Sequence, residues 1–127
     1  MGLELYMVGV MVKDMGKAVE FYRRLGVDIP EGSENQQHVP IKMGEMTFFL
    51  NTFSLNARWD PAKIEAAGGY RIILEFYLKN RAEVDAKYAE MIGYGYESHV
   101  APYQTFFNNY FSMINDPDGN TILISAE

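Results

Sequence analysis

The chain has 127 residues, a formal net charge of −6, 48% hydrophobic residues and no cysteine. This length suits one domain with a substantial core. The acidic charge argues against nucleic acid or an anionic membrane as a partner. It favours a cationic small molecule, although an acidic surface that only aids solubility also explains it. Without cysteine, disulfides, thiolate nucleophiles and thiolate metal sites are excluded.

The first ten residues lack a basic segment and contain Glu4, which does not fit a secretory signal peptide. No run of the sequence approaches the roughly 20 apolar residues that a membrane span needs. We therefore expect a cytoplasmic protein that has no membrane partner.

In the first half of the chain, alternating and helical apolar patterns predict a strand, a helix and then two short strands. The strands are expected over residues 5–12, 38–43 and 46–52, the helix over about 15–25, and a loop over 30–37. Asp14 is placed to cap the helix and Gly26 to end it. Gly44 and Glu45 form the turn between the last two strands.

The second half repeats this order. Strands are expected over residues 71–78, 96–101, 106–114 and 120–125, with a helix after the first of them. Asn80 and Glu83 resemble a capping box at the start of that helix. Asp116-Pro117-Asp118-Gly119 predicts a tight turn with Gly119 at positive φ.

Superposing Val12 on Leu78 aligns strand with strand and helix with helix, which indicates a duplicated βαβββ unit with a period of about 66 residues. We expect one α+β domain over 1–127, made of two tandem modules at about 1–52 and 70–127. Segment 53–69 connects them, and Pro61 is suited to start a short helix there. The curved mixed sheets should carry helices on their outer face and line a cavity on the other.

Two motifs add a family resemblance. Phe21-Tyr22-x-x-Leu25-Gly26 near the start, and Asp116-Pro-Asp-Gly-Asn120 before a closing strand, resemble the vicinal oxygen chelate superfamily. That superfamily includes glyoxalase I, extradiol dioxygenases, fosfomycin-resistance enzymes and bleomycin-resistance proteins. The resemblance covers nearly the whole chain and specifies the fold far better than the activity.

The resemblance implies four metal ligands, one on the first and one on the last strand of each module. The matching positions in this sequence are Met7, Ile73, Leu123, and either Phe48 or Phe49. None of them supplies the histidine nitrogen or carboxylate oxygen that such a metal needs. The resemblance is therefore closest in kind to the metal-free, bleomycin-resistance-like branch, and we expect no metal and no cofactor.

The only histidines, His38 and His99, do not occupy duplicate positions and do not lie on the strands that carry ligands in the family. We interpret each as a surface residue or a hydrogen-bonded strand residue rather than a metal ligand.

The alternation of the strands also predicts a mostly apolar cavity wall with few polar groups, which is the composition of a small-molecule pocket. The predicted ligand-binding residues are Met7, Met11, Phe49, Trp59, Arg71, Ile73, Glu75, Tyr77 and Leu123, and Thr121 and Ser125 share their face. Tyr77 or Trp59 can stack on a flat ligand. Plain packing is the alternative role for the methionines.

Glu75 is the one carboxylate that the pattern places on this face. It either pairs with Arg71, two residues away on the same strand, or serves as counter-ion or proton acceptor for a basic ligand. No nucleophile arrangement is present in the sequence, so we predict no catalytic residue.

These observations predict a homodimer that binds and sequesters a small organic ligand, cationic or aromatic, without a metal. The alternative is a metal-dependent lyase or dioxygenase that uses His38, His99 or Glu75. A third reading is a duplicated scaffold whose pocket is filled by its own side chains.

Overall fold

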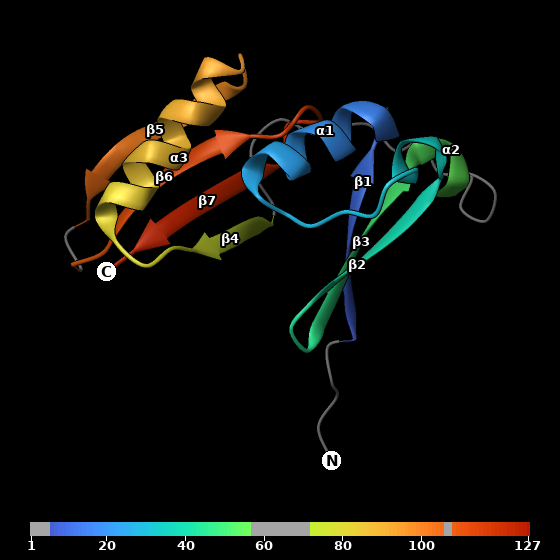
Figure 1. The fold of residues 1–127 in the computed structure, drawn as a ribbon, viewed down its shortest axis with the longest axis horizontal. Coiled ribbons are helices and arrows are strands. Elements are labelled where there is room, and N and C mark those ends of the chain that lie inside the picture. The colour runs from blue at the N-terminus through green and yellow to red at the C-terminus, as the bar shows by residue number, and fades with distance from the viewer. Residues whose placement is uncertain (1–5, 57–71, 106–107) are drawn as a thin grey trace. The chain divides into compact units, whose positions relative to one another are not determined.

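The structure is a computed structural model, and it describes residues 6–56, 72–105 and 108–127. The chain divides into two compact units, Met1–Glu65 and Ala66–Glu127, which are described separately. Unit 1 contains a sheet of 3 strands and unit 2 a sheet of 4 strands. Both units also carry helices, so the α+β class expected from the sequence is confirmed (Figure 1). None of the described helices is long and apolar enough to cross a membrane.

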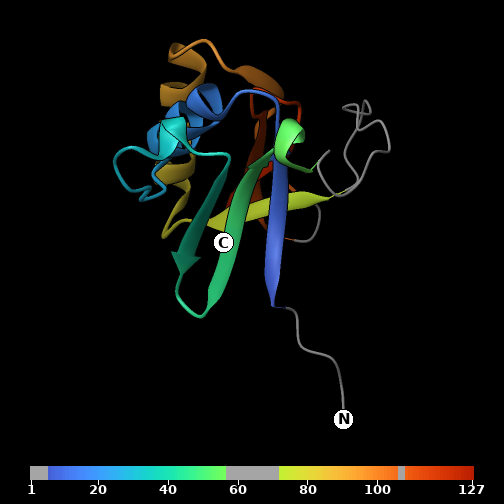
Figure 2. The same cartoon turned by 90° about the vertical axis from the view of Figure 1, so that its right-hand side faces the viewer.

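Unit 1 builds its sheet in the order β1-β3-β2, with β1 parallel and β2 antiparallel to β3 (Figure 2). Its elements are β1 (Met7–Val12), α1 (Met15–Leu25), the 3-10 helix η1 (Ser33–Asn35), β2 (His38–Met43), β3 (Met46–Thr52) and α2 (Phe53–Asn56). A parallel pair needs a long crossover, and α1 is part of that connection. The helix suggested at Pro61 lies outside the described residues.

Helix α1 forms where the sequence predicts it. The Asp14 side chain accepts a hydrogen bond from the Lys17 backbone N–H at 3.0 Å, and Gly26 ends the helix at φ 122°. The buried stripe consists of Met15, Ala18, Val19, Phe21, Tyr22 and Leu25. The Tyr22 ring centroid lies 6.2 Å from that of Phe48, so α1 covers the face of the sheet that carries Phe48.

Unit 2 has the strand order β4-β7-β6-β5, with β4 parallel to β7 and the other pairs antiparallel. Its elements are β4 (Ile73–Tyr77), α3 (Arg81–Gly93), β5 (Glu97–Gln104), β6 (Tyr110–Asn115) and β7 (Thr121–Ala126). Three strands follow α3, whereas two strands follow α1 among the residues described in unit 1. The loop with η1 precedes β2, where unit 2 has β5.

Helix α3 covers one face of its sheet (Figure 1). Asn80 Oδ1 accepts from the Glu83 N–H at 2.9 Å, and Glu83 Oε2 accepts from the Lys79 N–H at 3.0 Å. The capping box is therefore present, with the Glu83 carboxylate reaching one residue further back than expected. The apolar side chains buried on the covered side of the unit include Val84, Met91, Ile114, Ile122, Ile124 and Ala126.

Tyr110 of β6 contacts the first two turns of α3. Its hydroxyl donates to the Asp85 carboxylate, and the Arg81 guanidinium lies 5.2 Å from the ring centroid. The hydrogen bond to Asp85 raises the pKa of Tyr110, because the negative carboxylate favours the neutral phenol. This contact therefore persists to higher pH than the ordinary ionisation of tyrosine would allow.

Strand β6 begins later than the sequence pattern predicts. Asn108 has φ 66°, and the Thr105 N–H donates to the Asn109 carbonyl at 2.7 Å, so the chain turns there instead of continuing as a strand. The sequence pattern did not predict this turn, because positive φ is uncommon for residues other than glycine and no glycine marks the position.

The turn before β7 is held by Asp116. This buried carboxylate accepts from the Asp118 and Asn120 backbone N–H groups and from the Asn120 amide, at 2.8–2.9 Å. Gly119 has φ 83°, which confirms the positive φ predicted for it. The carboxylate thus accepts hydrogen bonds from turn N–H groups that have no backbone acceptor within a strand or helix.

We predict that Gly119→Ala lowers the free energy of unfolding by about 1 kcal/mol, because a side chain at positive φ is strained. Denaturant unfolding measures the change. Gly93→Ala is the matched control, since Gly93 lacks a positive φ and a Cβ there meets no atom within 4 Å. Equal stability of the two variants would contradict this assignment of the turn.

A second prediction concerns Ser112. Among the described residues, its Oγ is the one buried side-chain nitrogen or oxygen with no hydrogen-bond partner. Burial of an unpaired hydroxyl costs about 1–3 kcal/mol, so Ser112→Ala should raise the free energy of unfolding by about 1 kcal/mol. Ser125→Ala is the control, because Ser125 is equally buried but donates to Glu75, and it should lower stability. Destabilisation by Ser112→Ala would refute the assignment.

Candidate functional site

The face of the unit 2 sheet opposite α3 holds four of the seven predicted site residues that the structure describes, namely Ile73, Glu75, Tyr77 and Leu123. Strand register aligns its side chains in three rows across β4, β7, β6 and β5. The rows are Ile73, Thr121, Asn115 and Glu97; Glu75, Leu123, Met113 and Val100; and Tyr77, Ser125, Phe111 and Tyr103. We call this surface the unit 2 open face.

The middle of this face is apolar. Phe111, Met113 and Leu123 form a buried cluster, and Ile73 and Val100 pack against it. The predicted parity of β7 is confirmed, since Leu123 lies in this cluster while Ile122 and Ile124 belong to the other face.

Two register shifts in β5 determine which of its side chains lie on the unit 2 open face. They lie between Ser98 and Val100 and between Val100 and Tyr103. The Ser98 hydroxyl lies 2.6 Å from the Tyr88 hydroxyl of α3, whereas Val100 packs on the open-face cluster. Because each shift adds a residue to β5, Val100 and Tyr103 share a face although three positions separate them.

The third row forms an aromatic platform. Tyr103 meets Phe111 edge to face, with ring centroids 5.1 Å apart and planes at 85°. Tyr77 is 62% exposed and Tyr103 46% exposed, so both present ring surface to solvent. Tyr77 and Tyr103 stand on the outer strands of the sheet, about 14 Å apart for three strand spacings. This spacing suits a flat molecule lying across the sheet.

Glu75 lies in the row beside the platform. Its Oε2 accepts a hydrogen bond from the Ser125 hydroxyl at 2.7 Å, and Ser125 is buried. A rigid strand residue thereby orients an exposed carboxylate. Arg71, the alternative partner of Glu75, lies outside the described residues.

One expectation about this face was wrong. Glu75 is not its only carboxylate, because the register also places Glu97 there, opposite Asn115. The Asn115 amide donates to Glu97 Oε1 at 2.6 Å. The sequence pattern missed Glu97 because its face depends on the pairing of β5 with β6.

The remaining described site residues, Met7, Met11 and Phe49, lie on the face of the unit 1 sheet opposite α1, which we call the unit 1 open face. Its rows are Met7, Thr47 and Lys42; Gly9, Phe49 and Pro40; and Met11, Asn51 and His38. Trp59 lies outside the described residues. The predicted set is thus divided between the open faces of two units.

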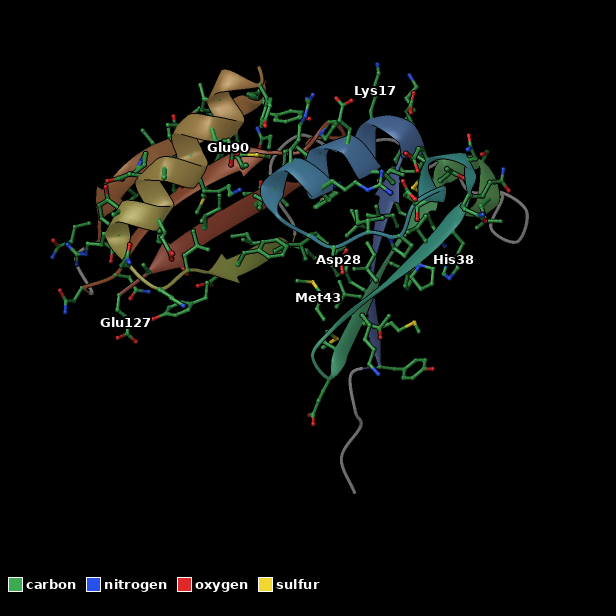
Figure 3. All side chains as sticks on the ribbon, in the orientation of Figure 1. Lys17, Asp28, His38, Met43, Glu90 and Glu127 are labelled. Atoms are coloured by element: carbon green, nitrogen blue, oxygen red, sulfur yellow. The ribbon has the colours of Figure 1, made fainter. Side chains whose placement is uncertain are left out.

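His38 is an exposed, hydrogen-bonded strand residue on the unit 1 open face, as the sequence predicted, but its partner Asn51 was not predicted. Its Nδ1 lies 2.6 Å from Asn51 Oδ1, and its ring centroid lies 5.4 Å from that of Phe49. Figure 3 labels His38 on β2. The signal was available, since the two-residue turn at Gly44 and Glu45 fixes the hairpin register and sets His38 opposite Asn51.

The strand register decides which of Phe48 and Phe49 occupies the fourth position that the family resemblance assigns to a metal ligand. Phe48 lies on the covered side against Tyr22, so Phe49 is the open-face residue equivalent to Leu123. Met7, Phe49, Ile73 and Leu123 offer a thioether and three hydrocarbon side chains, which do not fit a metal that takes nitrogen and oxygen ligands. Within residues 6–56, 72–105 and 108–127, no group of three or more His, Cys, Asp or Glu side chains is arranged to hold a metal ion.

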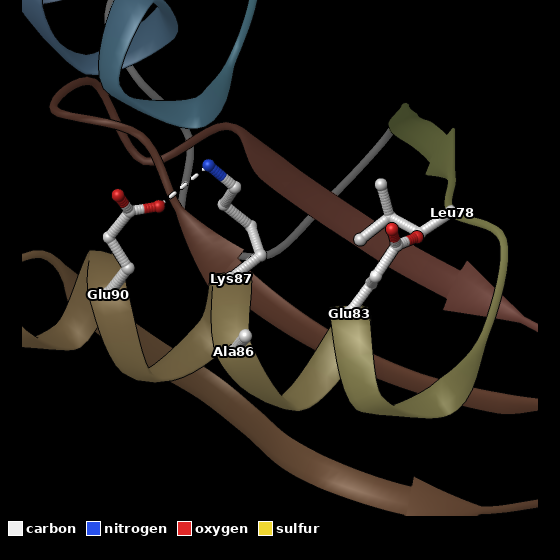
Figure 4. A pocket seen from close by; sticks show the side chains of 5 residues that line it. All are labelled: Leu78, Glu83, Ala86, Lys87 and Glu90. Atoms are coloured by element: carbon white, nitrogen blue, oxygen red, sulfur yellow. Dashed lines mark hydrogen bonds and ion pairs between the residues drawn. The ribbon is translucent and has the colours of Figure 1, made fainter.

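A surface pocket of about 470 Å³ lies elsewhere, beside α3 (Figure 4). It is lined by Leu78, Glu83, Ala86, Lys87 and Glu90. Lys87 Nζ pairs with Glu90 at 2.7 Å, and Glu83 caps the helix. Its charged groups thus have structural partners, and it contains none of the predicted site residues.

Comparison with known proteins identifies the family. The model of the Glyoxalase/Bleomycin resistance protein/Dioxygenase superfamily matches residues 5–124. The chain belongs to this superfamily. No curated protein sequence matches the chain.

Solved structures share the superfamily fold at low identity. A glyoxalase/bleomycin resistance protein/dioxygenase family enzyme from Burkholderia phytofirmans PsJN has a TM-score of 0.83 at 21% identity, covering 98% of each chain. A glyoxalase-related enzyme from Fulvimarina pelagi has a TM-score of 0.83 at 12% identity, covering 98% of this chain and 88% of that one. Lactoylglutathione lyase from Agrobacterium tumefaciens has a TM-score of 0.71 at 21% identity, covering 97% and 92%. At these identities the likeness concerns the fold alone.

Proposed function

We propose that this superfamily member binds a small aromatic cation on the unit 2 open face and sequesters it without a metal. The observation that carries the proposal is the exposed Glu75 carboxylate, held by Ser125 at 2.7 Å in the row beside Tyr77, Phe111 and Tyr103. Aromatic surface with an adjacent carboxylate is a favourable environment for an organic cation.

Each part of the face has a separate physical role in this proposal. The apolar cluster of Phe111, Met113 and Leu123 supplies a surface that releases water when a flat molecule covers it. The aromatic rings attract positive charge at their faces. Glu75 fixes the orientation of the ligand, and the net charge of −6 attracts cations from a distance.

Sequestration rather than turnover is supported by the groups on this face. Ser125 donates to Glu75, and a carboxylate does not activate a serine hydroxyl as an imidazole would. Glu75 and Glu97 are separated by the width of the sheet, since they stand on β4 and β5. These groups suit binding and orienting a ligand, but the two carboxylates are too far apart to act as acid and base on the same bond of a substrate.

We expect Glu75→Gln to weaken binding of benzyltrimethylammonium by about 0.2–1 kcal/mol, the range for loss of an exposed charge pair. Binding of neopentylbenzene, its uncharged isostere, should change much less. Ligand titration followed by NMR chemical shifts measures both affinities.

Glu45→Gln is the matched control, because it removes the same charge from the exposed turn of unit 1. It should leave both affinities unchanged. Equal weakening by the two substitutions would show that net charge, and not Glu75, controls cation binding. Equal affinity of the wild-type protein for the two probes would sink the proposal.

The rival function is a metal-dependent lyase or dioxygenase, as some superfamily members are. Elemental analysis decides between the two. About one zinc, nickel, manganese or iron per chain, removed by a chelator together with a measurable turnover, would replace the binding proposal with the enzymatic one. Elemental analysis would also detect a metal held by side chains outside the described part of the chain.

We also propose a cytoplasmic homodimer. Among the described strands, the unit 1 sheet ends at β1 and β2 and the unit 2 sheet at β4 and β5, and association of two copies can cover such edges. Light scattering at micromolar concentration should give about twice the chain mass of 14.5 kDa. A monomeric mass would refute the proposal.

A further inference from the structure

The unit 1 open face presents a hydrogen-bond acceptor of its own, independent of Glu75. Asn51 is 5% exposed, and its side-chain oxygen lies 2.6 Å from His38 Nδ1. An amide oxygen accepts hydrogen bonds and does not donate them, so Nδ1 carries the proton of the neutral imidazole. The lone pair is then on Nε2 of an exposed ring.

The aromatic surface beside His38 depends on Gly9. A Cβ at position 9 would lie 2.3 Å from Phe49 Cζ and 2.4 Å from Cε2, so the Phe49 ring occupies the space above the glycine. The ring therefore crosses β1 close to the backbone. The His38 ring centroid lies 5.4 Å away with its plane tilted by 44°.

The charges on this face differ from those of the unit 2 open face. Its nine residues include Lys42 as the one charged side chain and no carboxylate. The nine described residues of this face therefore offer no counter-ion for a cation. In the neutral imidazole the acceptor of this face is His38 Nε2, which suits an uncharged hydroxyl or N–H donor.

We propose that the unit 1 open face binds a flat neutral molecule with an aromatic hydroxyl, which donates its proton to His38 Nε2 while its ring packs on Phe49. Asn51 acts as a positioning residue that fixes the imidazole tautomer. The proposal goes beyond cation binding on unit 2, since it uses another unit and an opposite ligand chemistry. A purely structural His38–Asn51 pair would stabilise the hairpin without selecting hydroxyl donors.

The test compares 2-naphthol with 2-methoxynaphthalene, which has the same rings but no hydroxyl proton. One hydrogen bond corresponds to an affinity difference of about five- to tenfold. We expect wild-type protein to prefer 2-naphthol by that factor and His38→Phe to bind both probes equally. His99→Phe is the matched control on β5 and should keep the preference.

Two further measurements keep the proposal falsifiable if His38→Phe folds poorly. Long-range proton–nitrogen NMR of the wild-type protein should show an unprotonated Nε2, whose resonance shifts with 2-naphthol and not with 2-methoxynaphthalene. Gly9→Ala should weaken both probes, because the added Cβ displaces the Phe49 ring. A proton on Nε2 of the neutral ring, or equal wild-type affinity for the two probes, would overturn the proposal.

The Glu75→Gln variant separates this inference from the proposed function. It should leave the naphthol preference intact, and His38→Phe should leave benzyltrimethylammonium binding intact. Loss of the naphthol preference in Glu75→Gln would place the hydroxyl contact on unit 2 and overturn the assignment to His38.

Discussion

The parallel pairing of the first strand of each unit with its last strand is the constraint on which the rest of the structure depends. β1 pairs with β3, and β4 with β7, in parallel register. A parallel pair requires a crossover, and in both units the helix within it covers one face of the sheet. Neither α1 nor α3 covers the other face of its own sheet, and strand register decides which residues lie on that face. Strand register therefore determines which side chains lie next to one another on the open face of each sheet.

Both open faces combine an aromatic surface with one well-oriented polar group, but the polar groups differ. On unit 2, Ser125 orients the Glu75 carboxylate beside a tyrosine–phenylalanine platform. On unit 1, Asn51 orients the His38 imidazole beside Phe49. In each case a buried strand residue holds an exposed polar group in one orientation.

The superfamily fold is retained here without the donor atoms that the family resemblance places on it. Phe49 shows how the space is used instead, because its ring fills the gap above Gly9 and contributes apolar surface. Leu123, at the equivalent place in unit 2, belongs to the apolar cluster. The apolar side chains at these two positions contribute hydrophobic surface to the open faces.

The sequence by itself determined the elements of the fold and the faces of most strands. The caps at Asp14 and Asn80 and the positive φ of Gly119 are local properties of the chain, so short-range patterns were sufficient to predict them. Strict alternation likewise assigned Leu123 to the open face, because an uninterrupted strand has a period of two.

Only the tertiary structure decided the neighbours across strands. Tyr103 and Glu97 reached the open face through the register of β5, whose two shifts break the alternation. The His38–Asn51 pair is the exception, because the two-residue turn at Gly44 and Glu45 sets the register of its hairpin from the sequence. The contacts of Tyr103 and Glu97 join residues that are distant in the sequence, and their partners are fixed by strand pairing rather than by local propensity.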